Sequence, residues 1–333
     1  MSTDDDVLVW IDLEMDGLDL TKNFILEIAC IVTDFGFNNH YQGPNLVIHH
    51  PKSLLDAMGP WCMEQHTYSD LVQQVLRSKL SMSDAETEII NFLEKTTSLS
   101  KHKKRLILAG NSVYVDRYFL EKDMPRLNSL LDRSILDCST LKELIRRFNY
   151  NIYSKAPIKC GTLHRALYDI HNSIRELRYY QKTAFEEKQQ RKQDQLPLTK
   201  NITQYLIWIN INSTTIIHCI LTDGNLNIID EIIDGKTDDD LMKFFYRNEI
   251  YQDKLIVVAG KFLGSIRAQL KKLAPQFHKF CHYRSIDIDV VSVLCEKWFP
   301  NIYEQRPFKN DDDCNILKNS IELLRFYRST IFK

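Results

Sequence analysis

Apolar, β-branched runs and helical spacing of apolar residues divide the first half of the chain into recognisable elements. Four runs predict strands over residues 7–13, 26–35, 45–49 and 106–108. Apolar residues three or four positions apart predict helices over residues 83–94, 113–131, 139–148 and 162–187, the last with Thr162 as its N-cap. Strands that come first, followed by strands alternating with helices, predict a mixed α/β sheet flanked by helices.

The same pattern returns in the second half, in the same order. At a constant shift of 150 positions, residues 106–110 match residues 256–260, and further identical pairs follow: Arg117 and Arg267, Pro125 and Pro275, Asp137 and Asp287. Such collinear matches predict a tandem duplication. We expect domains at residues 1–187 and 203–333, joined by a linker at 188–202 that follows a charged stretch and contains Pro197.

Composition limits the classes of protein that the chain can be. Its 333 residues, 44% of them hydrophobic, can bury two cores, and its formal net charge of −1 lacks the basic surplus of proteins that track long nucleic acid. We therefore expect any nucleic-acid substrate to be small. The chain has no membrane-length apolar run, and its acidic N-terminus resembles neither a signal nor a transit peptide. Eight cysteines without a C-x-x-C pair favour reduced thiols and a cytoplasmic location.

Four carboxylates and one histidine are the candidate chemistry of the first half. Asp12 and Glu14 are two apart on a predicted strand, so both face one side, and their repulsion becomes favourable when a divalent cation lies between them. Asp116 opens a predicted helix. His164 and Asp169 are five apart, so we expect His164 to project from the loop or helix start and Asp169 from the helix face. This set suits two-metal phosphodiester hydrolysis with histidine as general base.

The short sequence segments around these residues make the combination specific. They include residues 10–15 (Trp-Ile-Asp-Leu-Glu-Met), 26–29, Trp61 and Cys62 with His66, residues 110–112 before Asp116, residues 139–144, and residues 164–170. Over residues 6–185 the chain closely resembles the oligoribonucleases, DEDDh-type 3′–5′ exoribonucleases with an RNase H-like fold. The resemblance implies that Asp12, Glu14, Asp116 and Asp169 hold two Mg²⁺ or Mn²⁺ ions and that His164 is the general base. It further implies dinucleotides and other very short RNAs as substrates, nucleoside 5′-monophosphates as products, and a homodimer.

The resemblance also implies substrate contacts in the first half. Leu18 and Trp61 resemble the family's base-contacting wedge and stacking platform. The alternative interpretation of Trp61 is that it belongs to the hydrophobic core. Ser112 and His66 resemble the family's binders of the substrate's 5′ phosphate. The basic run at residues 101–105 could be an RNA-binding patch or a solvated loop, and we prefer the solvated loop.

The second half has lost the metal ligands. The positions of Asp12, Glu14, Asp116, His164 and Asp169 are taken by Asn210, Asn212, Ile266, Asp311 and Ile316. Because amides are poor ligands for hard dications and isoleucine is none, we expect no catalytic metal there. The acidic run at residues 311–313 is interpreted as an exposed loop.

One segment of the second half nevertheless keeps a family feature. His282, Tyr283 and Arg284 resemble the segment that caps the 5′ phosphate across the family's dimer interface, whereas the aligned residues 132–134 do not. We expect a monomer shaped like a dimer, in which Tyr283 and Arg284 complete the first half's substrate pocket; the alternative is chance retention in a dead domain. Asp289 stands where the family's cap has a serine, so this carboxylate must turn away or the cap is weaker.

A short-RNA exoribonuclease has two alternatives. The first is a related exonuclease that acts on DNA or on longer RNA 3′ ends, against which the capped pocket and the missing basic surplus argue. The second is a protein that holds short nucleotides without cutting them, against which the complete carboxylate and histidine set argues.

Overall fold

The computed structural model describes residues 6–97, 104–157, 164–185, 205–211, 217–251, 256–308 and 315–332. Thr162, residues 101–103, the predicted linker at 188–202, Asn212 and residues 311–313 lie outside these ranges. The chain forms two compact units: Met1–Cys138 with Pro157–Tyr179, and Ser139–Ala156 with Tyr180–Lys333. Residues 139–156, which belong to the first half of the repeat in sequence, are therefore part of the second unit.

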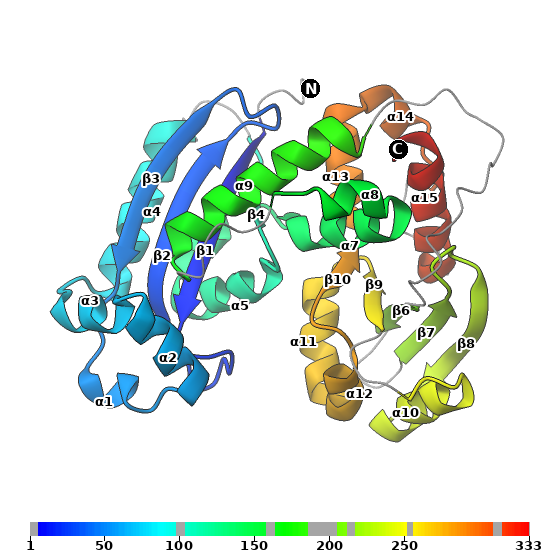
Figure 1. Ribbon diagram of the computed structural model, residues 1–333, viewed down its shortest axis with the longest axis horizontal. Coiled ribbons are helices and arrows are strands. Elements are labelled where there is room, and N and C mark those ends of the chain that lie inside the picture. The colour runs from blue at the N-terminus through cyan, green and yellow to red at the C-terminus, as the bar shows by residue number, and fades with distance from the viewer. Residues whose placement is uncertain are drawn as a thin grey trace. The chain divides into compact units, whose positions relative to one another are not determined.

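The first unit contains a five-stranded mixed sheet in the order β3-β2-β1-β4-β5 (Figure 1). Its strands are β1 (Val7–Met15), β2 (Ile25–Thr33), β3 (His40–Val47), β4 (Leu106–Gly110) and β5 (Ile135–Asp137). The central strand β1 is antiparallel to β2 and parallel to β4. The mixed α/β sheet that the sequence predicts is thus present, with β5 as a strand that the pattern did not indicate.

Helices form where the first unit was predicted to have them, but α1, α2 and α3 were not predicted, and two predicted helices have different bounds. They are α1 (Lys52–Leu55), α2 (Pro60–Tyr68), α3 (Leu71–Arg77), α4 (Met82–Thr97), α5 (Tyr114–Asp123), α6 (Pro125–Leu130) and α9 (Ala166–Thr183). The single helix predicted over residues 113–131 is wrong: it breaks at Met124 because Pro125 disfavours helical backbone in the residue before it. The last helix begins at Ala166 because His164 has left-handed backbone, with φ of 38°.

Strand β1 divides its side chains between the two faces of the sheet. Val9, Ile11 and Leu13 are buried in a core that α4 and α5 cover. Trp10 points to the other face, where its indole N–H donates to the Thr33 hydroxyl at 2.9 Å. Since strand side chains alternate, Asp12 and Glu14 share the face of Trp10 and lie opposite that core.

The second unit contains a sheet of the same design, in the order β10-β9-β6-β7-β8 (Figure 1). Its strands are β6 (Leu206–Ile211), β7 (Ile217–Thr222), β8 (Ile228–Gly235), β9 (Val257–Gly260) and β10 (Ser285–Asp287). Its helices are α7 (Cys138–Phe148), α8 (Tyr150–Ser154), α10 (Asp238–Arg247), α11 (Leu263–Leu273), α12 (Pro275–Phe280), α13 (Ile288–Trp298), α14 (Pro300–Glu304) and α15 (Ile316–Thr330). Strand β6 is antiparallel to β7 and parallel to β9, as β1 is to its neighbours.

Individual hydrogen bonds recur in the two units. The indole N–H of Trp208 donates to the Thr222 hydroxyl at 3.0 Å, which repeats the bond made by Trp10. A second shared bond joins an arginine of the long helix to the carbonyl of a residue with positive φ: Arg178 to Phe37, and Arg325 to Leu226. The recurrence of such local details supports the duplication inferred from the sequence.

Aromatic rings hold the first-half segment within the second unit. The ring of Phe148, at the end of α7, lies edge-on to Phe332 with centroids 5.3 Å apart. Phe185 contacts both Phe332 and Trp298. Within the described ranges, no helix is both long and apolar enough to span a bilayer.

Candidate active site

Three of the predicted metal ligands come together in the first unit. Asp12 and Glu14 come from β1 and Asp169 from the first turn of α9, and one potential ligand atom of each lies within 4.8 Å of the others. Carboxylate oxygens at this spacing suit a hard divalent cation. The structure therefore provides a candidate metal centre at the place that the sequence predicts.

A buried ion pair sets the position of α9. Glu27 lies opposite Glu14 on β2 and is fully buried. Its carboxylate accepts from Arg165 at 2.7 and 2.9 Å and from the backbone N–H of Ala166 at 3.2 Å. These bonds fix the beginning of α9 on β2, so Asp169, about one turn further along, faces Asp12 and Glu14. The arginine also balances a charge that would otherwise be buried alone.

A second tether joins α9 to the end of β4. The Asn111 side-chain amide donates to the Ser173 hydroxyl at 2.7 Å, and that hydroxyl donates to the Asp169 carbonyl at 2.9 Å. The helix that carries Asp169 is therefore held to the sheet both before and after this residue.

Asp116 lies beside the group of three. It is buried in the first turn of α5, and its Oδ1 accepts the backbone N–H of Leu13 at 3.0 Å. Because Leu13 stands between Asp12 and Glu14, this bond places Asp116 next to the same stretch of β1. Burial raises the pKa of Asp116 to about 8, against the opposing effect of its backbone hydrogen bonds.

The electrostatics of Glu14 show how closely the negative charges are packed. Burial raises its pKa to about 8, and the charges of Glu27, Asp169 and Asp116 add to this shift, while Arg165 opposes it. A bound divalent cation would offset both the burial and the repulsion. The donor set therefore fits a divalent metal.

The predicted general base precedes α9, as the five-residue spacing indicated. His164 has φ of 38°, a conformation that costs a non-glycine residue roughly 1–3 kcal/mol. Its ring meets that of Trp61 edge-on, with centroids 5.8 Å apart. Backbone strain of this kind is concentrated at functional sites.

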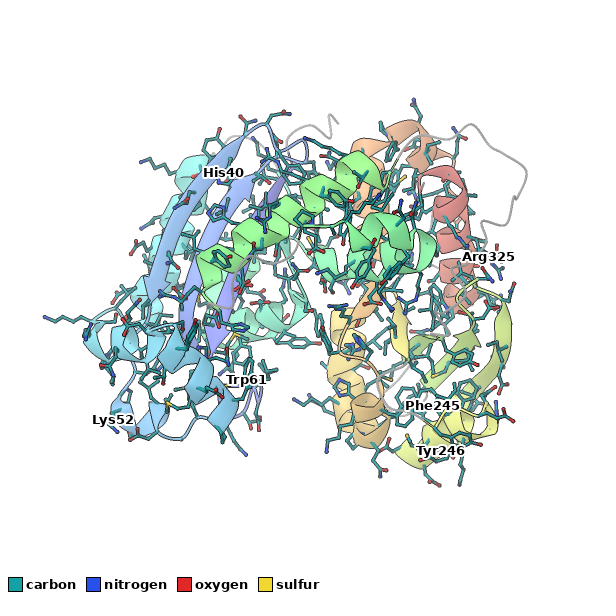
Figure 2. The ribbon with its side chains drawn as sticks, viewed as in Figure 1. His40, Lys52, Trp61, Phe245, Tyr246 and Arg325 are labelled. Atoms are coloured by element: carbon teal, nitrogen blue, oxygen red, sulfur yellow. The ribbon has the colours of Figure 1, made fainter. Side chains whose placement is uncertain are left out.

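The predicted base-contacting residues are both exposed. Trp61 lies on α2 with 62% of its surface exposed (Figure 2), so the core interpretation of this residue is wrong. Leu18, between β1 and β2, is 66% exposed. Two exposed apolar side chains in one unit are available to a ligand.

The predicted phosphate binders differ in accessibility. His66 is only 3% exposed, and burial lowers its pKa. Its Nε2 donates to the Met15 carbonyl at 2.9 Å, so Nε2 carries the proton of the neutral ring. Among the described residues its buried Nδ1 has no hydrogen-bond partner, and this nitrogen must carry a proton to donate to a phosphate. Ser112 is half-buried in the β4–α5 turn, where its N–H donates to Asp137 at 2.8 Å.

Tyr283 and Arg284 belong to the second unit and directly precede β10. Tyr283 is 57% exposed, and the Arg284 guanidinium lies 5.3 Å from its ring centroid. Arg284 pairs with Glu143 of α7. The Asp289 carboxylate accepts the N–H of Phe262 at 3.3 Å, a bond within its own unit.

The second unit lacks the carboxylate arrangement of the first at the aligned positions that the structure describes. Asn210 stands on β6, and Ile266 is buried in the core. Opposite Asn210, His218 bonds Glu231 at 2.8 Å, and Lys318 pairs with the same carboxylate at 3.2 Å. A histidine–glutamate hydrogen bond and a lysine–glutamate ion pair therefore occupy the sheet face where the first unit gathers its carboxylates.

Sequence reasoning gave no role to Glu27 and Arg165, although both lie in the motifs. The available signal was a carboxylate in the middle of an otherwise apolar strand, which predicts a buried charge with a partner. The identity of that partner, 138 positions away, depends on the tertiary fold.

Comparison with known proteins shows which proteins this chain is similar to. The Exonuclease family (RNase_T) matches residues 9–177. A probable oligoribonuclease of Drosophila melanogaster is 43% identical over 178 residues, which cover 54% of this chain and 82% of the fly protein. The mitochondrial oligoribonuclease of Homo sapiens is 44% identical over 181 residues, 54% of this chain and 74% of the human protein. Exonuclease I of Methylocaldum szegediense, a solved structure, is 13% identical with a TM-score of 0.42, covering 97% of this chain and 85% of that one.

The family match defines the class first: the chain is an exonuclease, a class that depends on divalent metal, and its first unit contains a carboxylate group that could hold one. The chain belongs to the oligoribonuclease family and is a 3′–5′ exoribonuclease.

Proposed function

We propose that this exoribonuclease acts on very short RNA, from dinucleotides to chains of a few nucleotides, and releases nucleoside 5′-monophosphates from the 3′ end. The group formed by Asp12, Glu14 and Asp169, with Asp116 beside it, is the observation that carries the proposal. We propose that these four residues hold two Mg²⁺ or Mn²⁺ ions, which when bound supply an activated water and stabilise the leaving 3′ oxygen.

The other residues of the first unit have separate tasks in this proposal. His164 accepts the proton of the attacking water, and its place directly before α9, the helix that carries Asp169, supports that role. Trp61 stacks on a base and Leu18 separates the bases, for which their exposure is required. Ser112 and His66 bind the 5′ phosphate.

The formal net charge of −1 favours a short substrate over DNA or long RNA. Long chains bind chiefly through many phosphate contacts to basic side chains, and a dinucleotide needs only a few. The alternative of a protein that only holds nucleotides is disfavoured because the first half keeps the complete set of four carboxylates and a histidine.

A trinucleotide with a 5′ label tests the direction and the products. Cleavage from the 3′ end should yield the labelled dinucleotide before the labelled mononucleotide, with unlabelled nucleoside 5′-monophosphate released at each step. EDTA should stop both steps, and Mn²⁺ should restore them. Labelled mononucleotide as the first product, or full activity in EDTA, would refute the proposal.

Replacing His164 with alanine should lower the rate and flatten its dependence on pH. A histidine accepts a proton only when its ring is neutral, so the wild-type rate should rise from acidic towards mildly alkaline pH. General-base catalysis contributes roughly 10²- to 10⁴-fold, and we expect a loss of that order. A variant that keeps the wild-type rate and pH profile would make His164 a structural residue.

We further propose that the chain is a tandem duplication whose halves, residues 1–187 and 203–333 joined by 188–202, form an internal pseudo-dimer. The equal strand orders and the recurring tryptophan–threonine bond support this proposal. In it, Tyr283 and Arg284 cap the 5′ phosphate of the substrate, as one surface of a symmetric dimer does for its partner.

The pseudo-dimer predicts a monomer in solution. Sedimentation equilibrium should give the mass of one chain, 39.2 kDa. In this proposal, the surface that would join the two protomers of an oligoribonuclease homodimer joins the two halves of one chain. Titration with a non-hydrolysable dinucleotide should give one site per chain. A mass near two chains, or two sites per chain, would count against the internal pairing.

A further inference from the structure

Glu143 is a buried carboxylate at the centre of three arginines. It lies on α7 with 1% of its side chain exposed. Its Oε2 accepts from Arg147 at 2.5 Å and from Arg146 at 2.8 Å, while its Oε1 accepts from Nη1 of Arg284 at 2.9 Å. Oε2 therefore accepts from the arginines of α7 itself, and Oε1 accepts from Arg284.

The helix that carries Glu143 is fixed to the strand that follows Arg284. Thr140 lies one turn earlier on the same face of α7. Its hydroxyl donates to the Ser285 carbonyl at 3.2 Å and accepts the N–H of Asp287 at 3.1 Å. Because β10 is an edge strand, its outer backbone groups have no neighbouring strand to bond. The Thr140 hydroxyl makes two of the hydrogen bonds that such a strand would make.

The backbone of Arg284 is held from its other side. Its N–H donates to Nδ1 of His282 at 3.0 Å, and its carbonyl accepts from Arg267 at 3.2 Å. Arg267 is itself buried and also donates to the Ser285 hydroxyl at 2.6 Å. With the main chain fixed in this way, Glu143 determines where the guanidinium lies.

The charge on Glu143 persists across the working range of pH. Although burial favours the neutral acid, Arg147 and Arg146 and the bond from Arg284 lower the pKa of Glu143 to about 2. A guanidinium has five N–H donors in a rigid fork, and the bond to Glu143 uses the Nη1 group. A planar fork anchored at one end can present its other end to a phosphate with little loss of conformational freedom.

The two halves of the repeat each keep one member of the Glu143–Arg284 pair. At the shift of 150 positions, Val293 stands where Glu143 does, and Ser134 stands where Arg284 does. Each half has thus lost one member of the pair, and the two members that remain are the two that meet. Chance loss would as readily leave two unmatched residues.

We propose that Glu143 is a positioning residue that aims Arg284 at the 5′ phosphate of the short RNA and thereby sets the preference for 5′-phosphorylated ends. The inference rests on the proposed capping function of Arg284. It assigns to α7, a helix of the catalytic half in sequence, the task of orienting a residue of the second half.

The test compares a 5′-phosphorylated dinucleotide with the same dinucleotide carrying a 5′ hydroxyl, using the full chain. The phosphate preference is the ratio of the two kcat/KM values. Glu143→Gln should lower it by roughly tenfold, the order expected when one charge-assisted contact is misaligned, through KM of the phosphorylated substrate. Arg146→Gln is the matched control, because it removes a charge from the same carboxylate but leaves the bond to Arg284, and should keep the preference.

A second variant covers the case in which Glu143→Gln fails to fold. Glu143→Met with Arg147→Met removes both members of the fully buried pair, a replacement that proteins often tolerate, and should lower the preference equally. A folded variant with unchanged preference, where Arg284→Ala lowers it, overturns the role of Glu143 and leaves the cap intact. An unchanged preference in Arg284→Ala itself overturns the cap and the inference with it.

Discussion

Replacing Asp116 with asparagine should lower RNA hydrolysis at least roughly 100-fold while the protein stays folded, since metal catalysis contributes several kcal/mol. Asp116 accepts the Leu13 N–H between two other candidate ligands, and the amide oxygen of asparagine can accept the same bond. The substitution therefore removes a ligand charge without removing the contact that fixes α5 to β1.

The stability of this variant has a definite sign. Burial raises the pKa of Asp116 to about 8, so the metal-free wild type loses stability as pH rises from the ordinary carboxyl range towards 8. Asparagine has no charge to bury, and the metal-free variant at pH 8 should unfold at an equal or higher temperature than the wild type. Added Mn²⁺ should stabilise the wild type more than the variant.

Asp123→Asn is the matched control, because it makes the same chemical change at the last residue of the same helix. It should keep most of the activity. More than about a tenth of wild-type activity in Asp116→Asn, given the several kcal/mol expected from metal catalysis, would remove Asp116 from the metal site.

Arg284→Ala should impair hydrolysis of 5′-phosphorylated dinucleotides about 10- to 100-fold, the effect of losing a charge-assisted bond worth roughly 1.5–3 kcal/mol. A dinucleotide has one scissile bond and little surface, so a single phosphate clamp supplies much of its binding. Longer RNA has further contacts and should be affected much less.

Two comparisons make this prediction specific. The 5′-hydroxyl dinucleotide offers no phosphate to the clamp, so its hydrolysis by Arg284→Ala should remain close to that by the wild type. Residues 1–190 alone lack Arg284 and should show the same selective defect, provided that residues 139–156 fold without the rest of the second unit. Equal losses on both dinucleotides would indicate a structural role for the arginine, and no loss on either would make the second half a passive stabiliser.

The sequence predicted those features that depend on local pattern. The alternation in β1 placed Asp12 and Glu14 on one face, and the five-residue spacing separated His164 from the helix that carries Asp169. The helix break at Met124 was readable from Pro125, and the prediction of one continuous helix gave apolar spacing too much weight.

Features that depend on contacts between distant residues were not predictable in this way. The Glu27–Arg165 pair that fixes α9 joins residues 138 positions apart, and the Glu143–Arg284 pair joins residues 141 apart. No periodicity specifies such partners. The same holds for residues 139–156, whose helical pattern is evident but whose membership of the second unit follows from packing.

The most direct test of the proposed function is the ratio of kcat/KM for a 5′-phosphorylated ribodinucleotide to that for a 20-mer RNA of the same 3′ sequence. It should be measured with the full chain in Mn²⁺ and in Mg²⁺, with EDTA and Asp116→Asn as controls for contaminating nuclease. We expect a ratio well above one, and activity on the dinucleotide that requires both the metal and Asp116. A ratio at or below one, with the same dependence on metal and Asp116, would contradict it and assign the chain to longer RNA ends.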